Sequence, residues 1–132
     1  MRVLVVDDND VVRRSISRVI KSGGQAECAE ATDGKAAVEK ALEWKPDLIL
    51  LDIRLPEVSG FEAATIIKKQ NPEMPILFCS IYDTPDILHE ARRIGDGFVL
   101  KEKIVEMLPK AVDALLKKRR FFPHLDLGDQ EP

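Results

Sequence analysis

Five short apolar runs, each followed by an amphipathic segment, constrain the fold of this chain more than any other feature of its sequence. Four runs are apolar at successive residues, namely Val3–Val6, Leu48–Leu51, Ile76–Cys79 and Phe98–Leu100, and a weaker run spans Gln25–Ala29. Strands that are buried on both faces show such runs, because helices cover both sides of a parallel sheet. The weaker run is expected at an edge of that sheet.

The segments between the runs have the period of amphipathic helices. Their apolar stripes occupy residues 12–20, 37–42, 61–67, 87–94 and 104–115. The first helix is expected to end at Gly23-Gly24. In the last stripe, Pro109 either marks the beginning of the helix or kinks its first turn. Five alternating strand–helix pairs predict an α/β fold with a doubly wound, five-stranded parallel sheet.

The composition fits one globular domain, with 132 residues, 45% hydrophobic and 33% charged. A net charge of −3 argues against a surface that is basic throughout, so we expect no direct nucleic-acid binding and no membrane contact. Met1-Arg2 leads directly into the first apolar run, which predicts a chain without a signal peptide. Cys28 and Cys79 lie in apolar stretches, and we expect buried free thiols and a cytoplasmic location.

Polar residues follow four of the predicted strands, where open α/β sheets bind their ligands. They are Asp7-Asp8, Asp52, Ser80 and Lys101. Each alone has an ordinary explanation as a turn, cap or solvated residue, and Asp10 is expected to cap the helix that follows it. Three carboxylates at one edge, however, repel one another unless a cation such as Mg²⁺ is bound. The nearby amine then indicates an anionic ligand such as a phosphoryl group.

These residues, together with Pro56, Gly60 and Gly97-Phe98, resemble the receiver domain of bacterial two-component response regulators. The resemblance covers residues 1–118 and implies a flavodoxin-like (βα)5 sheet with strand order 2-1-3-4-5. Residues 80–85 and 100–102 are most similar to receivers of the NarL/LuxR type, which usually carry a DNA-binding domain after a linker. Residues 119–132 are therefore expected to be a C-terminal tail or a truncated linker.

The resemblance implies that Asp52 accepts a phosphoryl group from a phosphohistidine of a sensor histidine kinase or phosphotransfer protein. It further implies Mg²⁺, or Mn²⁺ in its place, bound by Asp7, Asp8, Asp52 and the backbone carbonyl of Arg54. Lys101 would offset charge on the transferring group. On this interpretation the chain is a phosphoacceptor signalling domain rather than an enzyme, and it catalyses only its own phosphorylation and slow autodephosphorylation.

The resemblance also assigns a conformational switch. Ser80, which assists catalysis, would move to bond the new phosphoryl oxygen, and Phe98 would then turn inward from a place outside the core. The output surface would consist of the fourth helix (87–94), the fifth strand (98–100) and the fifth helix (104–115). A homodimer through this surface is one form that the output could take.

Several positions depart from the commonest receiver pattern. Glu102 stands where many receivers have a cis-proline, and the loop at 94–97 is one residue shorter than usual. Ile81 is bulky and is expected to restrict access to the phosphoacceptor. Arg54 and Tyr82 match the variable positions beside the path of water to the phosphoryl group, so their long side chains are expected to slow hydrolysis.

Two basic groups leave alternatives open. Arg13, Arg14 and Arg18 are expected to point outward from the first helix, either as a kinase contact or as a solvated face. The basic run 117–120 would either complement the dipole of the last helix or lie in a linker near DNA.

Two rival functions also fit parts of the sequence. A Mg²⁺-dependent aspartyl phosphohydrolase of the haloacid dehalogenase type normally needs a second Asp two residues after its nucleophile, but Arg54 follows Asp52 at that distance. Asp10 satisfies the same spacing after Asp8, although the chain is short for such an enzyme. A non-phosphorylated, receiver-like interaction module predicts missing or substituted acidic residues, and none of them is missing here.

Overall fold

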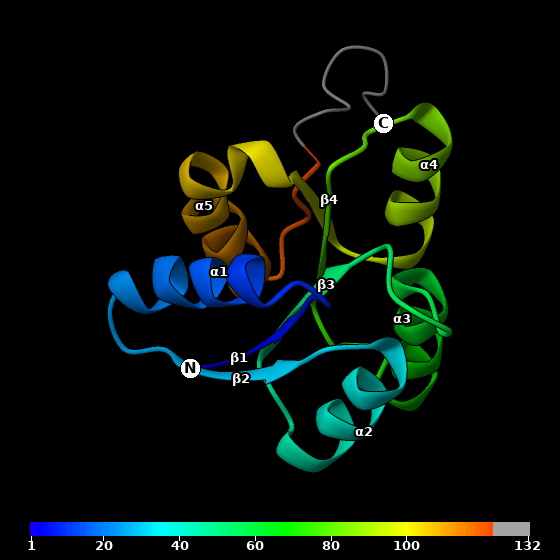
Figure 1. Cartoon of the computed structure of the whole chain (residues 1–132), viewed down its shortest axis with the longest axis horizontal. Coiled ribbons are helices and arrows are strands. Elements are labelled where there is room, and N and C mark those ends of the chain that lie inside the picture. Colours follow the sequence, from blue (N-terminus) through cyan, green and yellow to red (C-terminus); the bar gives the residue numbers. More distant parts are fainter. Residues whose placement is uncertain (123–132) are drawn as a thin grey trace.

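Five parallel strands form one sheet in the order β2-β1-β3-β4-β5, as the computed structural model shows for residues 1–122, the part of the chain that is described (Figure 1). The strands are β1 (Arg2–Val6), β2 (Glu27–Ala31), β3 (Leu48–Asp52), β4 (Ile76–Ser80) and β5 (Gly97–Leu100). The helices are α1 (Asp10–Ser22), α2 (Gly34–Trp44), α3 (Gly60–Gln70), α4 (Pro85–Ile94) and α5 (Ile104–Leu116), which a 3-10 turn at Lys101–Lys103 precedes. The predicted fold and strand order are confirmed.

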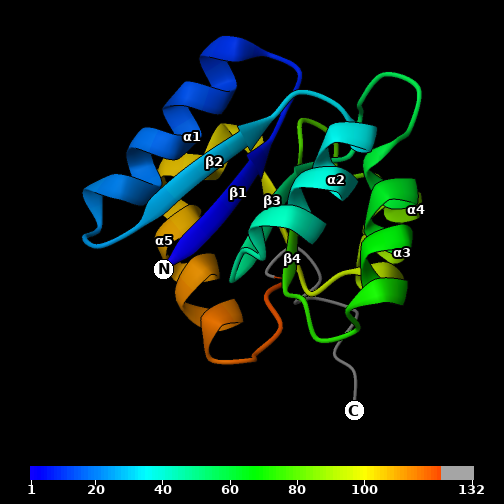
Figure 2. The same cartoon turned by 90° about the horizontal axis from the view of Figure 1, so that it is seen from below.

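The helices cover the sheet from both sides, with α1 and α5 on one face and α2, α3 and α4 on the other (Figure 2). Val3 and Val5 of β1 pack in the same cluster as apolar side chains of α1 and α5. Leu4 and Val6, which alternate with them, pack toward α2 and α3. This alternation explains why the strands are apolar at successive residues. Within the described residues, no helix is long and apolar enough to cross a membrane.

Side-chain caps fix where the helices begin. Asn9 accepts a hydrogen bond from the Val12 backbone N–H at 3.0 Å and is the N-cap of α1. The prediction that Asp10 is this cap is wrong, because Asp10 is already the first helical residue. There its carboxylate lies near the positive end of the helix dipole and accepts from Arg13. Helix α3 begins with a full capping box between Ser59 and Glu62.

Three predicted details need correction. The strand predicted at residues 25–29 lies two residues later, because its pairing with β1 begins only at Glu27. Cys28 is half-buried rather than buried, since β2 is an edge strand, whereas Cys79 is buried and both thiols are free. Helix α5 begins at Ile104, five residues before Pro109, so Pro109 does not mark its beginning and lies beyond its first turn.

Residues 119–122 continue past α5 and return to the edge of the sheet, and we call them the C-terminal strap. The backbone N–H of Phe121 donates to the Asp96 carbonyl, and its carbonyl accepts from the N–H of Phe98, both at 2.9 Å. A parallel bridge thus pairs Phe121 with Gly97, whose missing side chain leaves room, because a Cβ there would lie 3.0 Å from the Phe121 oxygen.

The strap also contacts the end of α4. The Arg120 guanidinium donates to the Arg92 carbonyl and, at 3.2 Å, to that of Gly95, so this cation stabilises the C-terminus of α4. The prediction that the basic run serves the last helix is wrong for Arg120, because the chain turns back after α5. Of the residues predicted as tail, Phe121 and Phe122 therefore pack against the core and Arg120 is hydrogen-bonded to α4, whereas 123–132 lie outside the described residues.

Candidate functional site

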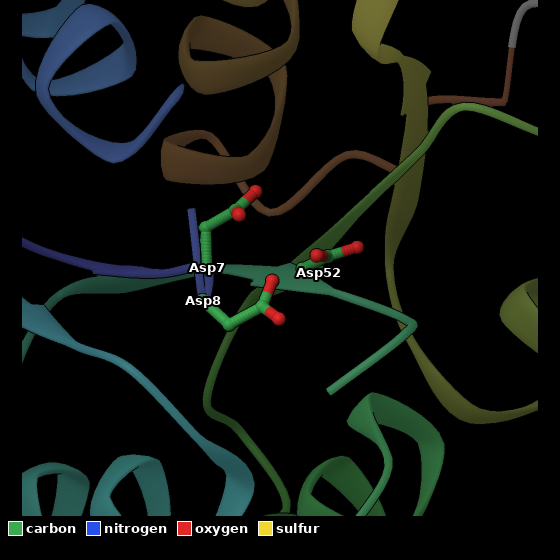
Figure 3. Close-up of side chains that lie close together, drawn as sticks. All are labelled: Asp7, Asp8 and Asp52. Atoms are coloured by element: carbon green, nitrogen blue, oxygen red, sulfur yellow. The ribbon is translucent and has the colours of Figure 1, made fainter. Parts of the chain in front are cut away.

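Three carboxylates meet at the carboxyl edge of the two central strands (Figure 3). Asp7 and Asp8 follow β1 directly, and Asp52 is the last residue of the neighbouring strand β3. The parallel pairing of Val6 with Leu51 places the ends of these strands side by side. One carboxylate oxygen from each residue lies within 4.8 Å of the others.

Burial differs strongly within this acidic group. The residues Asp7 and Asp52 are only 1% and 5% exposed, whereas Asp8 is exposed. A buried carboxylate needs a partner, because an unpaired ion in the protein interior costs several kcal/mol. Even a neutral polar group without a hydrogen bond costs about 2 kcal/mol there. The site therefore holds two carboxylates whose charges the protein itself must compensate.

Lys101 supplies part of that compensation. Its ammonium lies 2.7 Å from Asp7 Oδ2 and 3.1 Å from Asp52 Oδ2, with the second contact a hydrogen bond. Burial alone would lower the pKa of Lys101, but the two carboxylates raise it above its usual value. Burial also raises the pKa of Asp52, with Asp7 adding to the effect and Lys101 opposing it. One ammonium thus only partly compensates two carboxylates.

The chemistry of the donor set fits a hard divalent cation. Asp7 Oδ1 accepts from the Asn9 backbone N–H at 2.9 Å, but the buried Asp7 Oδ2 has no hydrogen-bond donor within the described part of the chain. The 2.7 Å contact with Lys101 is an ion pair without the angles of a hydrogen bond. An oxygen of this kind, close to oxygens of Asp8 and Asp52, is suited to Mg²⁺.

Gly60 lets the chain after β3 fold closely around Asp52. Its N–H donates to the Ile53 carbonyl at 2.9 Å, and a Cβ at this position would lie 2.1 Å from the Asp52 backbone oxygen. Any side chain there would displace the end of β3. The close approach of the backbone beside the acidic group therefore explains why this position of the sequence motif is a glycine.

Four other predicted site residues lie on or just after β3 and β4. Ser80 ends β4, is buried, and accepts from the Tyr82 N–H at 3.0 Å. The Arg54 N–H donates to Asp52 Oδ1 at 3.3 Å, so the backbone of Arg54 lies next to the carboxylate. Ile81 and Tyr82 are exposed in the loop after β4.

The Phe98 side chain does not lie where the sequence predicts it. The residue is fully buried among the core side chains of α3 and α4, whereas it was expected outside the core until after phosphorylation. The inward position is thus already present in this structure. Glu102 lies in the 3-10 turn that leads into α5, and residues 1–122 contain no cis peptide bond.

Arg13 was expected to point outward with Arg14 and Arg18, and this prediction is wrong for Arg13. Its residue is only 8% exposed, while Arg14 and Arg18 are exposed. The guanidinium donates to the Asp7 carbonyl, to Asp10 and to Glu30. The three-residue spacing of Asp10 and Arg13 on one helix was the only sequence feature that could have indicated this arrangement.

The comparisons with known proteins agree with this geometry. Residues 3–113 match the family model for the response regulator receiver domain. The chain is 37% identical over 114 residues to the chemotaxis protein CheY of Thermotoga maritima, covering 83% of this chain and 95% of that protein. It is 36% identical over 118 residues to the transcriptional regulatory protein YdfI of Bacillus subtilis, covering 88% of this chain and 55% of that protein. The chain thus spans about half the length of the transcriptional regulators that it matches.

Solved structures show the same relationship. A two-component response regulator of the LuxR family from Aurantimonas superposes with a TM-score of 0.87 at 28% identity, covering 91% of this chain and 87% of that one. The signal receiver domain of a putative NarL response regulator from Mycobacterium tuberculosis superposes with a TM-score of 0.84 at 33% identity. This match covers 89% of this chain and 97% of that one. The fold and site define a signalling domain of two-component systems. The chain belongs to the response regulator receiver domain family and is similar to NarL/LuxR-type members.

Proposed function

We propose that this domain accepts a phosphoryl group on the Asp52 carboxylate from a phosphohistidine of a sensor histidine kinase or phosphotransfer protein. The observation that carries the proposal is the position of Asp52. Its side chain lies at the edge of the central strands, within the acidic group and hydrogen-bonded to Lys101 at 3.1 Å. A nucleophile, a cationic partner and oxygen ligands for a metal therefore share one site.

The proposed reaction is a single displacement at phosphorus. An Asp52 carboxylate oxygen forms the new P–O bond, the P–N bond to the donor imidazole breaks, and its electron pair stays on the imidazole nitrogen. The Lys101 ammonium balances charge on the phosphoryl oxygens as they transfer. Mg²⁺, or Mn²⁺, would be bound by Asp7, Asp8, Asp52 and the carbonyl of Arg54, and it supplies positive charge to the same oxygens.

Output is proposed to pass from Ser80 to the surface of α4, β5 and α5. The Ser80 hydroxyl is buried at the end of β4, next to the strand that bears Phe98. A phosphoryl oxygen would attract this hydroxyl and draw the loop after β4 inward, while Phe98 keeps its buried position. A homodimer through α4, β5 and α5 is one output that this movement could control.

The domain is proposed to be a signalling module rather than an enzyme, located in the cytoplasm and without direct contacts to nucleic acids or membranes. Residues 1–118 would form the receiver, with the remaining residues as a tail or linker. The chain covers 55% of the transcriptional regulatory protein YdfI but 95% of CheY, so its relatives fit both a piece of a longer regulator and a single-domain regulator.

Incubation with acetyl phosphate and Mg²⁺, followed by intact mass measurement, tests this function. We expect a gain of one phosphoryl group that EDTA prevents and that Asp52→Asn abolishes. The matched control Asp86→Asn, which changes an exposed carboxylate on α4, should be labelled like the wild type. Absence of labelling by acetyl phosphate and by histidine kinases would support a non-phosphorylated module. Multiple turnover of a small phosphomonoester would support the phosphohydrolase instead.

A further inference from the structure

The Arg13 guanidinium holds the loop that carries two of the three acidic residues. Its Nη1 donates to the Asp7 backbone carbonyl at 2.8 Å, its Nη2 to Asp10 at 2.6 Å, and its Nε to Glu30 at 2.7 Å. These partners belong to the residue that follows β1, to the first turn of α1 and to the edge strand β2. One planar group therefore connects three separate elements.

The geometry of this contact bears directly on the acidic group. The Asp7 carbonyl belongs to the peptide that joins Asp7 to Asp8, so a hydrogen bond to it restricts the orientation of that peptide. This peptide determines the directions in which the buried Asp7 and the exposed Asp8 project. The donor is itself fixed on both sides, because Asp10 and Glu30 accept from its other nitrogens.

We infer that Arg13 is a positioning residue that holds the Asp7–Asp8 peptide in the orientation required for binding the divalent cation. The inference rests on the proposed metal-dependent function, and it concerns affinity for the ion rather than the chemical step. Partners that orient metal ligands through hydrogen bonds commonly change metal affinity about 10- to 100-fold when they are removed.

The positive charge of Arg13 allows a decisive test of this inference. Arg13 is a cation beside a cation site, so its charge opposes the binding of Mg²⁺, and its removal on charge alone should strengthen binding. If positioning dominates, removal should weaken binding. The two effects have opposite signs, so the direction of the change separates them.

The experiment measures Mg²⁺ affinity by isothermal titration calorimetry, and independently by the NMR shift of the Asn9 amide, which donates to Asp7 Oδ1. Arg13→Met removes the three hydrogen-bonding nitrogens and keeps an unbranched, though shorter, side chain. Arg14→Met is the matched control, because it makes the same charge change at an exposed position of the same helix. Arg13→Lys keeps the charge and loses the planar set of donors.

We expect the Kd for Mg²⁺ to rise about 10-fold in Arg13→Met, to rise less in Arg13→Lys, and to stay equal or fall slightly in Arg14→Met. Thermal unfolding without metal is measured alongside. If Arg13→Met only lowers the Tm and binds Mg²⁺ like Arg14→Met, the residue is merely structural and the inference fails. If Arg13→Met does not fold, an unchanged Kd in Arg13→Lys overturns the inference equally well. Failure of the wild type to bind Mg²⁺ would instead contradict the proposed function.

Discussion

The Arg54 guanidinium stacks on the ring of Tyr82, with 4.7 Å between Arg54 Cζ and the ring centroid. Arg54 lies two residues after Asp52 and donates to it, while Tyr82 donates its N–H to Ser80. The stacked pair thus connects the loops after β3 and β4 beside the carboxylate. Although both side chains are exposed, each holds the other in place through a cation–π contact.

We expect this pair to slow hydrolysis of the aspartyl phosphate. Arg54→Ala and Tyr82→Ala should each accelerate dephosphorylation, because water gains access to phosphorus. In the double variant, the fold-increase in the hydrolysis rate should be smaller than the product of the two single increases. The difference corresponds to a coupling free energy of about 0.5–1 kcal/mol. The rates are measured by the loss of phosphorylated protein in intact mass spectra after the donor has been removed.

Arg93→Ala is the control for this prediction, since it removes an exposed arginine on α4 that pairs with Glu90 instead. It should leave the hydrolysis rate unchanged. Equal rates for the wild type and the double alanine variant would refute the prediction. Fully multiplicative effects would show that the two side chains act separately.

Replacement of Lys101 by Met should destabilise the metal-free protein strongly. It leaves the carboxylates of Asp7 and Asp52 buried without their cationic partner, and breaking a buried pair in this way costs about 3 kcal/mol. Urea denaturation in EDTA measures the loss. Mg²⁺ should recover more stability in Lys101→Met than it adds to the wild type, because the dication replaces the missing charge. A variant as stable as the wild type in EDTA would contradict this account of the site.

The raised pKa of Asp52 predicts a specific pH dependence. The folded protein keeps a proton on Asp52 in a range where the unfolded chain, with a carboxyl pKa of 3.8, has released it. The free energy of unfolding therefore falls as pH rises from 3.8 through the raised pKa. Asp52→Asn removes this dependence, so its stability relative to the wild type should increase with pH across that window and then level off.

Urea denaturation in EDTA from about pH 4 to about pH 7 measures that difference. Asp86→Asn, an exposed substitution, should not reproduce it. A difference that shrinks as pH rises would have the wrong sign and would show that Lys101, rather than burial, dominates the pKa of Asp52. Saturating Mg²⁺ should abolish the advantage of the variant, because the cation stabilises the charged carboxylate.

Arg120→Ala should loosen the C-terminal strap. Without the guanidinium, the carbonyls of Arg92 and Gly95 lose a donor, and exchange of the Phe98 amide with solvent should accelerate because its acceptor is the Phe121 carbonyl. Hydrogen exchange followed by NMR measures the effect. The neighbouring substitution Lys118→Ala removes an exposed cation outside the strap and should leave this amide protected. Equal protection in Arg120→Ala would show that the backbone pairing alone holds the strap.

The sequence predicted the sheet well because strands buried on both faces have a simple pattern. Val3–Val6 and Leu48–Leu51 are apolar at every residue, and both lie in the middle of the sheet. The edge strand β2 was predicted two residues early, since Glu27 and Glu30 interrupt its apolar pattern and its beginning depends on pairing with β1. Tertiary contacts, rather than local pattern, determine that boundary.

The acidic group was predictable for a similar reason. Parallel strands end at one edge, so residues that follow them must lie together, as Asp7, Asp8 and Asp52 do. The burial of Arg13 was not predictable from helical period, which placed it on the solvent side. It is buried because Glu30 and the Asp7 carbonyl happen to face it from other elements. The inward position of Phe98 likewise depends on packing around it that no local pattern encodes.

The C-terminal strap determines where the described part of the chain ends relative to the sheet. Because Phe121 pairs with β5 and Arg120 is hydrogen-bonded at the end of α4, the described part of the chain ends beside these two elements rather than at the end of α5. A protein engineer who joins another domain to this one should therefore place the junction after residue 122. A fusion made at residue 118 would leave the edge of β5 unpaired, open to association with strands of other molecules, and would direct the added domain along a different path.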